Sequence, residues 1–273
     1  MFTGGEKMLG AIVGDIIGSI YEWDNIKTKD FELINPRAFF TDDTVMTCAV
    51  AQGLFESNLD DEEDTKSMII KHMVQIGRRY PNCGYGGMFY QWLFGDKQVP
   101  YNSFGNGSAM RVSPVAWVSD DFNLVLRLAR NTAEVTHNHP EGIKGAQAVA
   151  AAIFLARKGK SFKDIKNFIT ENYYYLDFTL DEIRDTYKFD VTCAGTVPPA
   201  IVAFLESKDF EDAIRNAISL GGDSDTLAAI TGSIAEAYYG VPEYLEKMAM
   251  SKLDDRLRNI VNNRKIYYKG MDR

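Results

Sequence analysis

The chain has 273 residues, of which 45% are hydrophobic and 25% charged, so it can bury a sizeable core in one large domain or two small ones. Its formal net charge of −8 argues against a general nucleic-acid-binding or anionic-membrane-binding surface, although not against a local basic pocket. Cys48, Cys83 and Cys193 are scattered without paired spacing, which favours a reduced, cytoplasmic setting over a disulfide scaffold. The apolar run at residues 8–14 is too short to span a bilayer and is followed by Asp15, so neither a membrane span nor a signal peptide is expected.

The first helix is predicted from Met8 to about Trp23, after a loose end at residues 1–7. Gly10, Gly14 and Gly18 recur every four residues within it. Because glycine lowers helix propensity, such a row indicates close approach by another backbone.

Polar residues are spaced along the same helix. Asp15, Ser19 and Glu22 are expected to share one face, although Asp15 is equally compatible with a satisfied polar residue in the core. Glu22 ends the predicted helix and leads into the polar stretch 24–37, which we expect to form a mobile flap.

The rest of the chain is predicted to be mostly helical, with Pro- and Gly-rich loops between the helices. Strand signals are sparse, and the aromatic run Tyr173–Leu176 is expected to pack in a core. No repeat, low-complexity tract or linker divides the sequence, so a single all-α domain over residues 1–273 is predicted. The further helices are expected at 42–56, 66–79, 88–94, 108–115, 121–136, 140–158, 161–174, 191–206, 210–220, 225–239 and 252–268.

Two short acidic clusters with nearly the same chemistry stand at predicted helix starts: Thr41-Asp42-Asp43-Thr44 and Asp223-Ser224-Asp225-Thr226. Either cluster alone is adequately explained as a helix cap. Capping needs one oxygen, however, and each cluster supplies two carboxylates and a threonine hydroxyl. Since four carboxylates cannot crowd together without a cation or a proton, divalent cations with oxygen ligands are predicted if the fold joins the clusters.

Two glycine loops each precede a probable helix: Gly84-Tyr85-Gly86-Gly87 and Ser103-Phe104-Gly105-Asn106-Gly107-Ser108. Glycine lets backbone N–H groups approach an anion closely, and the following helix start adds a favourable dipole. Neither loop has Rossmann or P-loop spacing, and each alone is more typical of an ordinary turn. Tyr85 or Phe104 could offer a flat face to a base. Arg111 could pair with phosphate, but a structural ion pair is favoured.

The pair His137-Asn138-His139 precedes Pro140. Zinc is disfavoured because His72 is the only other histidine and the cysteines do not cluster. A hydrogen-bonding or helix-start role is therefore predicted. No nucleophile triad is recognisable among the Ser, Cys and His residues.

Five motifs occur in an order that carries a resemblance. Together they resemble the ADP-ribosylglycohydrolase family, of the type that includes the dinitrogenase-reductase-activating glycohydrolase, over about residues 9–240. Any one motif is weak, whereas the ordered set is specific. The motifs are Gly14-Asp15-x-x-Gly18-Ser19-x-Tyr21-Glu22, Phe40-Thr41-Asp42-Asp43-Thr44, Gly105-Asn106-Gly107-Ser108-Ala109-Met110-Arg111, Thr136-His137 and Gly221-Gly222-Asp223-Ser224-Asp225-Thr226.

This resemblance implies a compact all-α fold with two Mg²⁺ ions, sometimes Mn²⁺, at the floor of an ADP-ribose cleft. The loops 84–87 and 103–107 would embrace the diphosphate, Phe104 would contact the adenosine, and His137 a ribose or phosphate. Glu22, Asp43 and Asp225 would be catalytic. The implied metal ligands are Glu22, Thr41, Asp42, Asp43, Asp223, Asp225 and Thr226.

The charges of this set agree with two divalent cations, since five ionised carboxylates would face four positive charges. Bridged by the ions, a water becomes a better nucleophile. The bond to be cut is glycosidic, and its cleavage develops oxocarbenium-like charge that carboxylates stabilise. Glu22 is the best candidate to handle protons. The expected reaction releases ADP-ribose from a modified protein or nucleic acid.

Two other function classes stay open. One is a di-metal hydrolase of a free ADP-ribose derivative or another nucleotide glycoside. The other is a non-enzymatic member that binds ADP-ribose or serves a structural role, against which the complete acid set argues. The Gly18–Glu22 pattern resembles relatives that cleave oxygen-linked ADP-ribose, and the loop at 84–87 lacks an acidic residue that relatives acting on arginine can carry. An oxygen-linked acceptor is therefore favoured over arginine.

Overall fold

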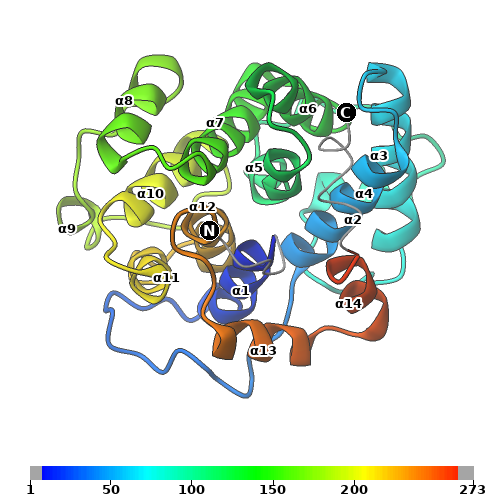
Figure 1. Ribbon diagram of the computed structural model, residues 1–273. Helices are drawn as coiled ribbons and strands as arrows, with labels where there is room; N and C mark the ends of the chain where they lie inside the picture. The colour runs from blue at the N-terminus through cyan, green and yellow to red at the C-terminus, as the bar shows by residue number, and fades with distance from the viewer. Residues whose placement is uncertain (1–7, 264–273) are drawn as a thin grey trace.

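Helices make up the regular structure of residues 8–263, the part of the chain that the computed structural model describes (Figure 1). Within these residues the β pairing is limited to an isolated bridge between Gly105 and Thr192. The predicted all-α fold is confirmed. None of the described helices is long and apolar enough to cross a membrane. The helices are α1 (Leu9–Gly18), α2 (Asp42–Glu56), α3 (Glu62–Gly77), α4 (Gly87–Phe94), α5 (Gly107–Met110), a 3-10 turn (Ser113–Trp117), α6 (Phe122–Glu134), α7 (Pro140–Arg157), α8 (Phe162–Asn172), α9 (Leu180–Ile183), α10 (Cys193–Leu205), α11 (Phe210–Ile218), α12 (Ser224–Tyr239), α13 (Glu243–Lys252) and α14 (Asp255–Val261).

Helices α1 and α12 pack side by side at the centre of the molecule (Figure 1). The glycine row of α1 makes this contact: a Cβ added to Gly14 would lie 2.0 Å from the Ala228 carbonyl oxygen, and one added to Gly18 would lie 2.5 Å from the Cα of Asp225. A Cβ on Gly10 would likewise meet the backbone of Gly232. The close backbone approach predicted from the glycine spacing is confirmed, and it runs antiparallel.

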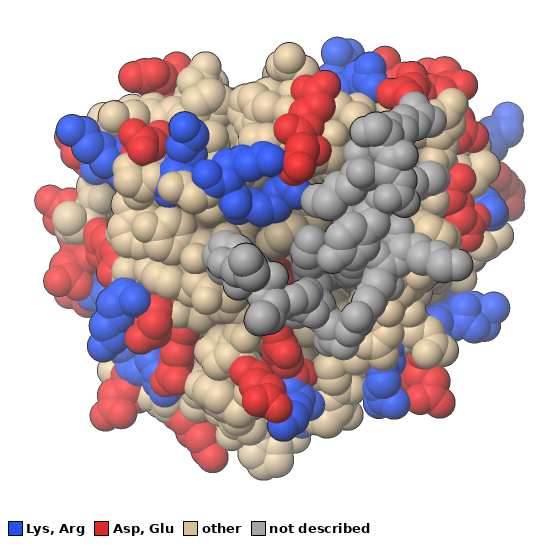
Figure 2. Space-filling model, in the orientation of Figure 1, with Lys and Arg blue, Asp and Glu red and all other residues tan. Residues whose placement is uncertain are grey.

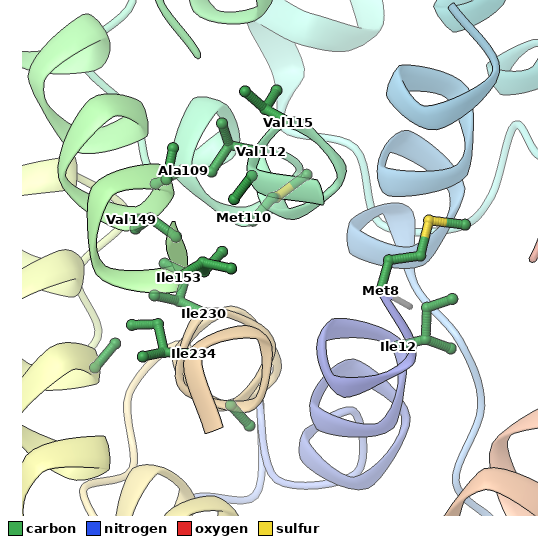
Figure 3. Close-up of a cluster of buried hydrophobic side chains, with 14 of the residues drawn as sticks. Met8, Ile12, Ala109, Met110, Val112, Val115, Val149, Ile153, Ile230 and Ile234 are labelled. Carbon is green, nitrogen blue, oxygen red and sulfur yellow. The ribbon is translucent and has the colours of Figure 1, made fainter. Parts of the chain in front are cut away.

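The other side of α12 packs against α7. Figure 3 shows Ile230 and Ile234 of α12 near Val149 and Ile153 of α7. All four side chains are fully buried, and each contributes roughly 1.5–3 kcal/mol through the loss of apolar surface from water. Helix α7 is rich in alanine, and these short side chains let the two helices approach each other closely. Helix α12 is thus held on both sides, which fixes where its first residues lie.

A carboxylate from α12 caps the N-terminus of α1. The N-cap residue, Met8, is left-handed with φ 76° and offers no side-chain cap. Instead, the two carboxylate oxygens of Glu236 accept hydrogen bonds from the backbone N–H groups of Leu9 (3.2 Å) and Gly10 (3.0 Å). These are two of the donors that a helix start leaves without a partner. The α1–α12 pair is therefore joined by polar contacts as well as by glycines.

Several predicted helix ends are wrong. Helix α1 stops at Gly18 rather than Trp23, because the chain turns where Gly18 meets the backbone of Asp225. Helix α3 begins at Glu62 rather than Lys66, since Asp61 caps it by accepting from the N–H groups of Glu63 and Asp64. The single helix predicted at 108–115 is divided into α5 and the following 3-10 turn.

The C-terminal prediction is also wrong. Helix α13 was missed, and the helix predicted at 252–268 begins instead at Asp255, because Leu253 is extended and Asp254 caps α14. The short helix α9 was missed as well. The predicted loose end at residues 1–7 and the predicted helix beyond residue 263 lie outside the described residues.

Charged side chains are mixed on the surface. On the described part of the face in Figure 2, lysine and arginine stand among aspartate and glutamate without one continuous basic area. This pattern agrees with the net charge of −8 and gives no support to a general nucleic-acid surface on that face.

Candidate active site

The first acidic cluster is held in place by Asp15 of α1. Its carboxylate accepts hydrogen bonds from the backbone N–H and the hydroxyl of Thr41 and from the N–H and the hydroxyl of Thr44. Asp15 itself is 1% exposed. The Thr41 oxygen also accepts from the N–H of Asp43 and so caps α2. Asp15 thus fixes the turn that presents Asp42 and Asp43, and its interpretation as a satisfied core residue is confirmed.

The second cluster stands at the start of α12. Gly221 and Gly222 adopt φ angles of 64° and 75°, which residues other than glycine rarely adopt. They turn the chain into the helix. Asn25 fastens this turn, since its side chain bonds both the carbonyl (2.9 Å) and the N–H (2.8 Å) of Gly222. The side-chain amide of Asn106 donates to Asp223 at 2.7 Å. The polar stretch after Glu22 is therefore tied, at its beginning, to the second cluster.

The fold brings the two clusters together. The hydroxyl of Thr226 donates to a carboxylate oxygen of Asp43 at 3.3 Å. Carboxylate oxygens of Glu22, Asp223 and Asp225 lie within 4.8 Å of one another. The remaining oxygens of Asp43 and Asp225, both named Oδ1, are buried without a hydrogen-bond partner. Buried polar atoms normally have partners, so these two mark a position for a positive group.

Burial and mutual repulsion raise the pKa values of all these acids. Burial raises the pKa of Asp223 to about 6. Burial, followed by the charge of Asp225, raises the pKa of Glu22 to about 7. The pKa values of Asp42, Asp43 and Asp225 lie well above their usual range, for burial first and neighbouring carboxylates second. Without a cation the cluster therefore resists full ionisation.

These acids form the floor of a cleft of about 660 Å³. The two glycine loops form its walls, and Tyr101, Met110 and Arg111 complete one side. The predicted site residues that line the cleft are Glu22, Asp42, Asp43, Gly84, Tyr85, Gly86, Gly87, Ser103, Gly105, Asn106, Gly107, His137, Asp223, Asp225 and Thr226.

Backbone geometry explains one glycine in each wall. Gly84 has a φ of 111°, and a Cβ there would lie 3.0 Å from a carboxylate oxygen of Asp42. A Cβ on Gly107 would lie 3.1 Å from Nε2 of His137. The backbone at Gly84 thus lies close to the floor, and the backbone at Gly107 lies close to the histidine. Because neither residue has a side chain, the space between the loops stays open to a ligand.

Two predicted residues are placed differently. Phe104 does not line the cleft: its ring is 50% exposed and packs edge-on against His139. Thr41 is buried behind the floor, where its hydroxyl donates to Asp15. The Thr41 hydroxyl oxygen is still directed towards the first cluster, because it accepts the hydrogen bond from the Asp43 N–H.

The structure also adds residues that the sequence patterns did not single out. Trp23 and Phe189 line the cleft beside Glu22 and Asp223, and their rings stack at 5.2 Å. Trp23 directly follows Glu22, and this adjacency was the available signal. For Phe189, in a loop far along the chain, the sequence carries no signal.

The prediction for His139 is confirmed, whereas the prediction for Arg111 is wrong. His139 accepts from the N–H of Glu141 and caps α7, so its predicted helix-start role is confirmed. The predicted ion pair of Arg111 is wrong: its guanidinium is fully buried and, within residues 8–263, bonds to the Thr132 carbonyl and the Thr136 hydroxyl instead of a carboxylate.

The donor set suits hard divalent cations. All candidate ligand atoms are carboxylate or hydroxyl oxygens, which Mg²⁺ and Mn²⁺ prefer. The unpartnered oxygens belong to Asp43 of α2 and Asp225 of α12, and both residues line the same cleft. The residues present therefore fit the predicted ions.

Fold and site together define an all-α protein with an acid-floored cleft between glycine-rich walls. The sequence profile of the ADP-ribosylglycohydrolases matches residues 6–270, so the chain belongs to that family of enzymes. Its relatives share most of its length. Human ADP-ribosylhydrolase ARH3 is 27% identical over 320 residues, covering 89% of this chain and 87% of the human protein.

A second relative is the ADP-ribosylarginine hydrolase Tri1 of Pseudomonas putida, 25% identical over 282 residues that cover 90% of this chain and 74% of that protein. A solved structure of an ADP-ribosylglycohydrolase-related protein complex superposes with a TM-score of 0.71 at 23% identity. It covers 97% of this chain and 96% of that one, and it supports the fold.

Proposed function

We propose that this enzyme uses two divalent cations, Mg²⁺ or Mn²⁺, to hydrolyse the glycosidic bond between ADP-ribose and a modified acceptor, with release of ADP-ribose. One observation carries the proposal: acids from α2, α12 and the segment after α1 meet at the floor of a cleft and leave two buried oxygens unpartnered. Family membership supports the hydrolysis of ADP-ribose linkages.

The ions would be held by Glu22, Asp42, Asp43, Asp223 and Asp225 together with the hydroxyls of Thr41 and Thr226. When bound, they would offset the carboxylate charge and polarise a water and a ribose hydroxyl. The chain's own groups bind and orient the substrate. N–H groups of loops 84–87 and 103–107 would bind the diphosphate. Backbone donors can bind an anion in this way without a basic surface, which this acidic protein lacks on the described part of the face in Figure 2.

Glu22 differs from the other acids because it follows α1 in a non-helical segment and is only partly buried. It would cover the ribose and hold the proton that the leaving acceptor atom needs. The carboxylates of Asp43 and Asp225 would stabilise positive charge that develops at the ribose carbon. Oxygen-linked acceptors are the proposed class. The scattered, unbridged cysteines fit a cytoplasmic setting.

The test is an activity panel with arginine-, serine-, nucleic-acid- and polymer-linked ADP-ribose, with Mg²⁺ and with a chelator. The expected result is release of ADP-ribose from the serine linkage when Mg²⁺ is present, and no release in the chelator. Release from arginine alone would move the acceptor class towards that of Tri1, and activity in the chelator would remove the metal. Glu22→Gln should keep ADP-ribose affinity within a few-fold in calorimetry while turnover falls.

A further inference from the structure

A second cavity of about 650 Å³ lies beside the cleft. The segment 187–191 separates the two: Phe189 lines both, and Val191 lines the cleft alone. The segment is fixed at three points, since Tyr187 donates to the Gly195 carbonyl (3.0 Å), Lys27 donates to the Tyr187 carbonyl (2.7 Å) and the Asn106 N–H donates to the Val191 carbonyl (2.7 Å). The wall between the two cavities is therefore held in place by specific hydrogen bonds.

Exposed aromatic rings lead from one cavity to the other. Trp23, 80% exposed, stacks on Phe189, 41% exposed, and Tyr175 on the far side is 67% exposed. Large apolar side chains left in water beside a cleft mark binding surfaces. We call Trp23, Phe189, Tyr175 and the neighbouring Phe178 the aromatic track.

The track begins at the end of the cleft where the proposed reaction takes place. Trp23 follows Glu22, and the Tyr187 ring lies 2.8 Å from where a Cβ of Gly222, the residue before Asp223, would stand. With ADP-ribose on the glycine loops and its distal ribose at the acids, as proposed above, the acceptor would leave the cleft past Trp23 and Phe189, which line it.

We propose that the aromatic track binds the polypeptide that flanks the modified side chain. A nucleic-acid strand is disfavoured because the chain carries a net charge of −8 and the second cavity offers one cation, Lys188, beside one anion, Asp190. A small acceptor would not reach a cavity on the far side of Phe189. The inference rests on the proposed function, since it assumes that ADP-ribose fills the cleft.

The test compares two substrates with the same linkage: an ADP-ribosylated peptide with several residues on each side, and the same amino acid with blocked termini. Tyr175→Ala should lower kcat/KM for the peptide about tenfold, through KM, while the ratio for the blocked amino acid moves less than twofold. Phe39→Ala is the matched control, because it removes another exposed aromatic ring (53%, against 67% for Tyr175) that lies outside both cavities.

Equal effects of Tyr175→Ala on both substrates would overturn the track and leave the proposed function intact. A loss seen with an ADP-ribosylated oligonucleotide instead of the peptide would replace the polypeptide with nucleic acid and overturn it too. No turnover of any substrate would overturn the proposed function and this inference with it.

An independent observation concerns the buried chain Arg111–Thr136–His137. The Arg111 guanidinium donates to the Thr136 hydroxyl oxygen at 2.7 Å, and that oxygen lies 2.7 Å from Nδ1 of His137. Arg111 and Thr136 are fully buried and His137 is 4% exposed. Arginine can only donate, so the Thr136 oxygen accepts from it.

The Thr136 hydroxyl proton then has a single acceptor within hydrogen-bond reach in residues 8–263, Nδ1 of His137. The opposite assignment, with a proton on Nδ1, would leave the buried hydroxyl proton unpaired, which is costly. We infer that Arg111 and Thr136 are positioning residues that hold His137 as the neutral Nε2–H tautomer. Its Nε2, beside Gly105 and Gly107, then faces the cleft as a hydrogen-bond donor to a ligand oxygen.

Burial and the Arg111 charge support the neutral form, because both hold the pKa of His137 well below its usual range. Nitrogen-15 NMR of the histidine-labelled free protein tests the assignment, and the chain has only three histidines to resolve. His137 should show the neutral Nε2–H pattern from pH 6 to 8.

Thr136→Val, which keeps the shape and removes the hydroxyl, should shift the ring towards the other tautomer, and Thr136→Ser should restore the original pattern. The signals of His72 and His139 report whether the variants fold. A proton on Nδ1 in the native protein, or an unchanged tautomer in a folded Thr136→Val variant, would overturn the assignment whatever the substrate is.

Discussion

The buried acids along the α1–α12 pair fall into two kinds. Glu236 and Asp15 have donors for both carboxylate oxygens, from helix N–H groups in one case and from two threonines in the other. Asp43 and Asp225, equally buried, each keep an oxygen without a partner. Burial alone therefore does not distinguish a structural acid from a functional one. Hydrogen-bond satisfaction does.

This difference has an energetic meaning. Removing a satisfied acid strands its donors, each at a cost of about 1–3 kcal/mol. Removing an unsatisfied one relieves repulsion in the metal-free protein. Activity and stability should thus respond in opposite ways at the two kinds of position.

The largest expected effect is on catalysis. Asp43→Asn and Asp225→Asn should each lower kcat/KM by roughly 100- to 1,000-fold, because each removes a charge that acts on the reacting centre. Their melting temperatures in a chelator should equal or exceed that of the native protein. Steady-state kinetics and thermal melts check both halves, and a clear destabilisation in the chelator would place these acids with the structural kind.

Asp15→Ala should produce the reverse pattern in stability. It strands the N–H and hydroxyl donors of Thr41 and Thr44, so the free energy of unfolding should fall by about 2–4 kcal/mol. Urea denaturation in the chelator measures this directly. A variant as stable as the native protein would show that the four hydrogen bonds contribute nothing net.

Metal should sharpen the contrast. At a concentration 100 times its Kd, Mg²⁺ should raise the free energy of unfolding by about 2.7 kcal/mol through binding to the folded state alone. Asp225→Asn should lose most of this increase. Glu236→Gln, at the far end of the same helix, is the matched control and should keep it. An equal response in all three proteins would refute metal binding at the floor.

The smallest expected effect is on pH dependence. Burial raises the pKa of Glu236 to about 8, against an ordinary glutamate value of about 4.5. The folded state therefore binds the proton more tightly than the unfolded one, and stability falls as pH rises between these values. Glu236→Gln should flatten that fall in melts from pH 5 to 8, because the amide does not titrate. An identical slope in the variant would mean that Glu236 ionises normally.

Much of this architecture was predictable from local patterns. The glycine row indicated close approach by another backbone, which is α12 in the structure, and the acidic clusters indicated two helix starts with excess oxygen ligands. Helix caps were harder, because Asp61 could be recognised as the start of α3 only once its acceptor role was visible.

What local patterns could not supply were contacts over long sequence separations. Phe189 stacks on Trp23 from more than half the chain away, and no periodicity marks such a pair. Arg111 was predicted to form a structural ion pair, because its full burial depends on the packing of several helices around it. The position of Phe104 was also not predicted: its ring lies outside the residues that line the cleft and packs on His139.

In the proposed metal site, the glycine contact between α1 and α12 would also set the spacing of the ligands and so influence which ion binds. Gly14 and Gly18 set the distance between the helix that carries Asp15, and through it the first cluster, and the helix that begins at Asp225. Mg²⁺ requires oxygen ligands at about 2.0–2.1 Å in near-octahedral order, whereas Ca²⁺ accepts about 2.3–2.6 Å. A methyl group on Gly14 would act as a wedge that widens the floor and favours the larger ion. Discrimination by ionic radius would then depend on a residue that touches no ligand.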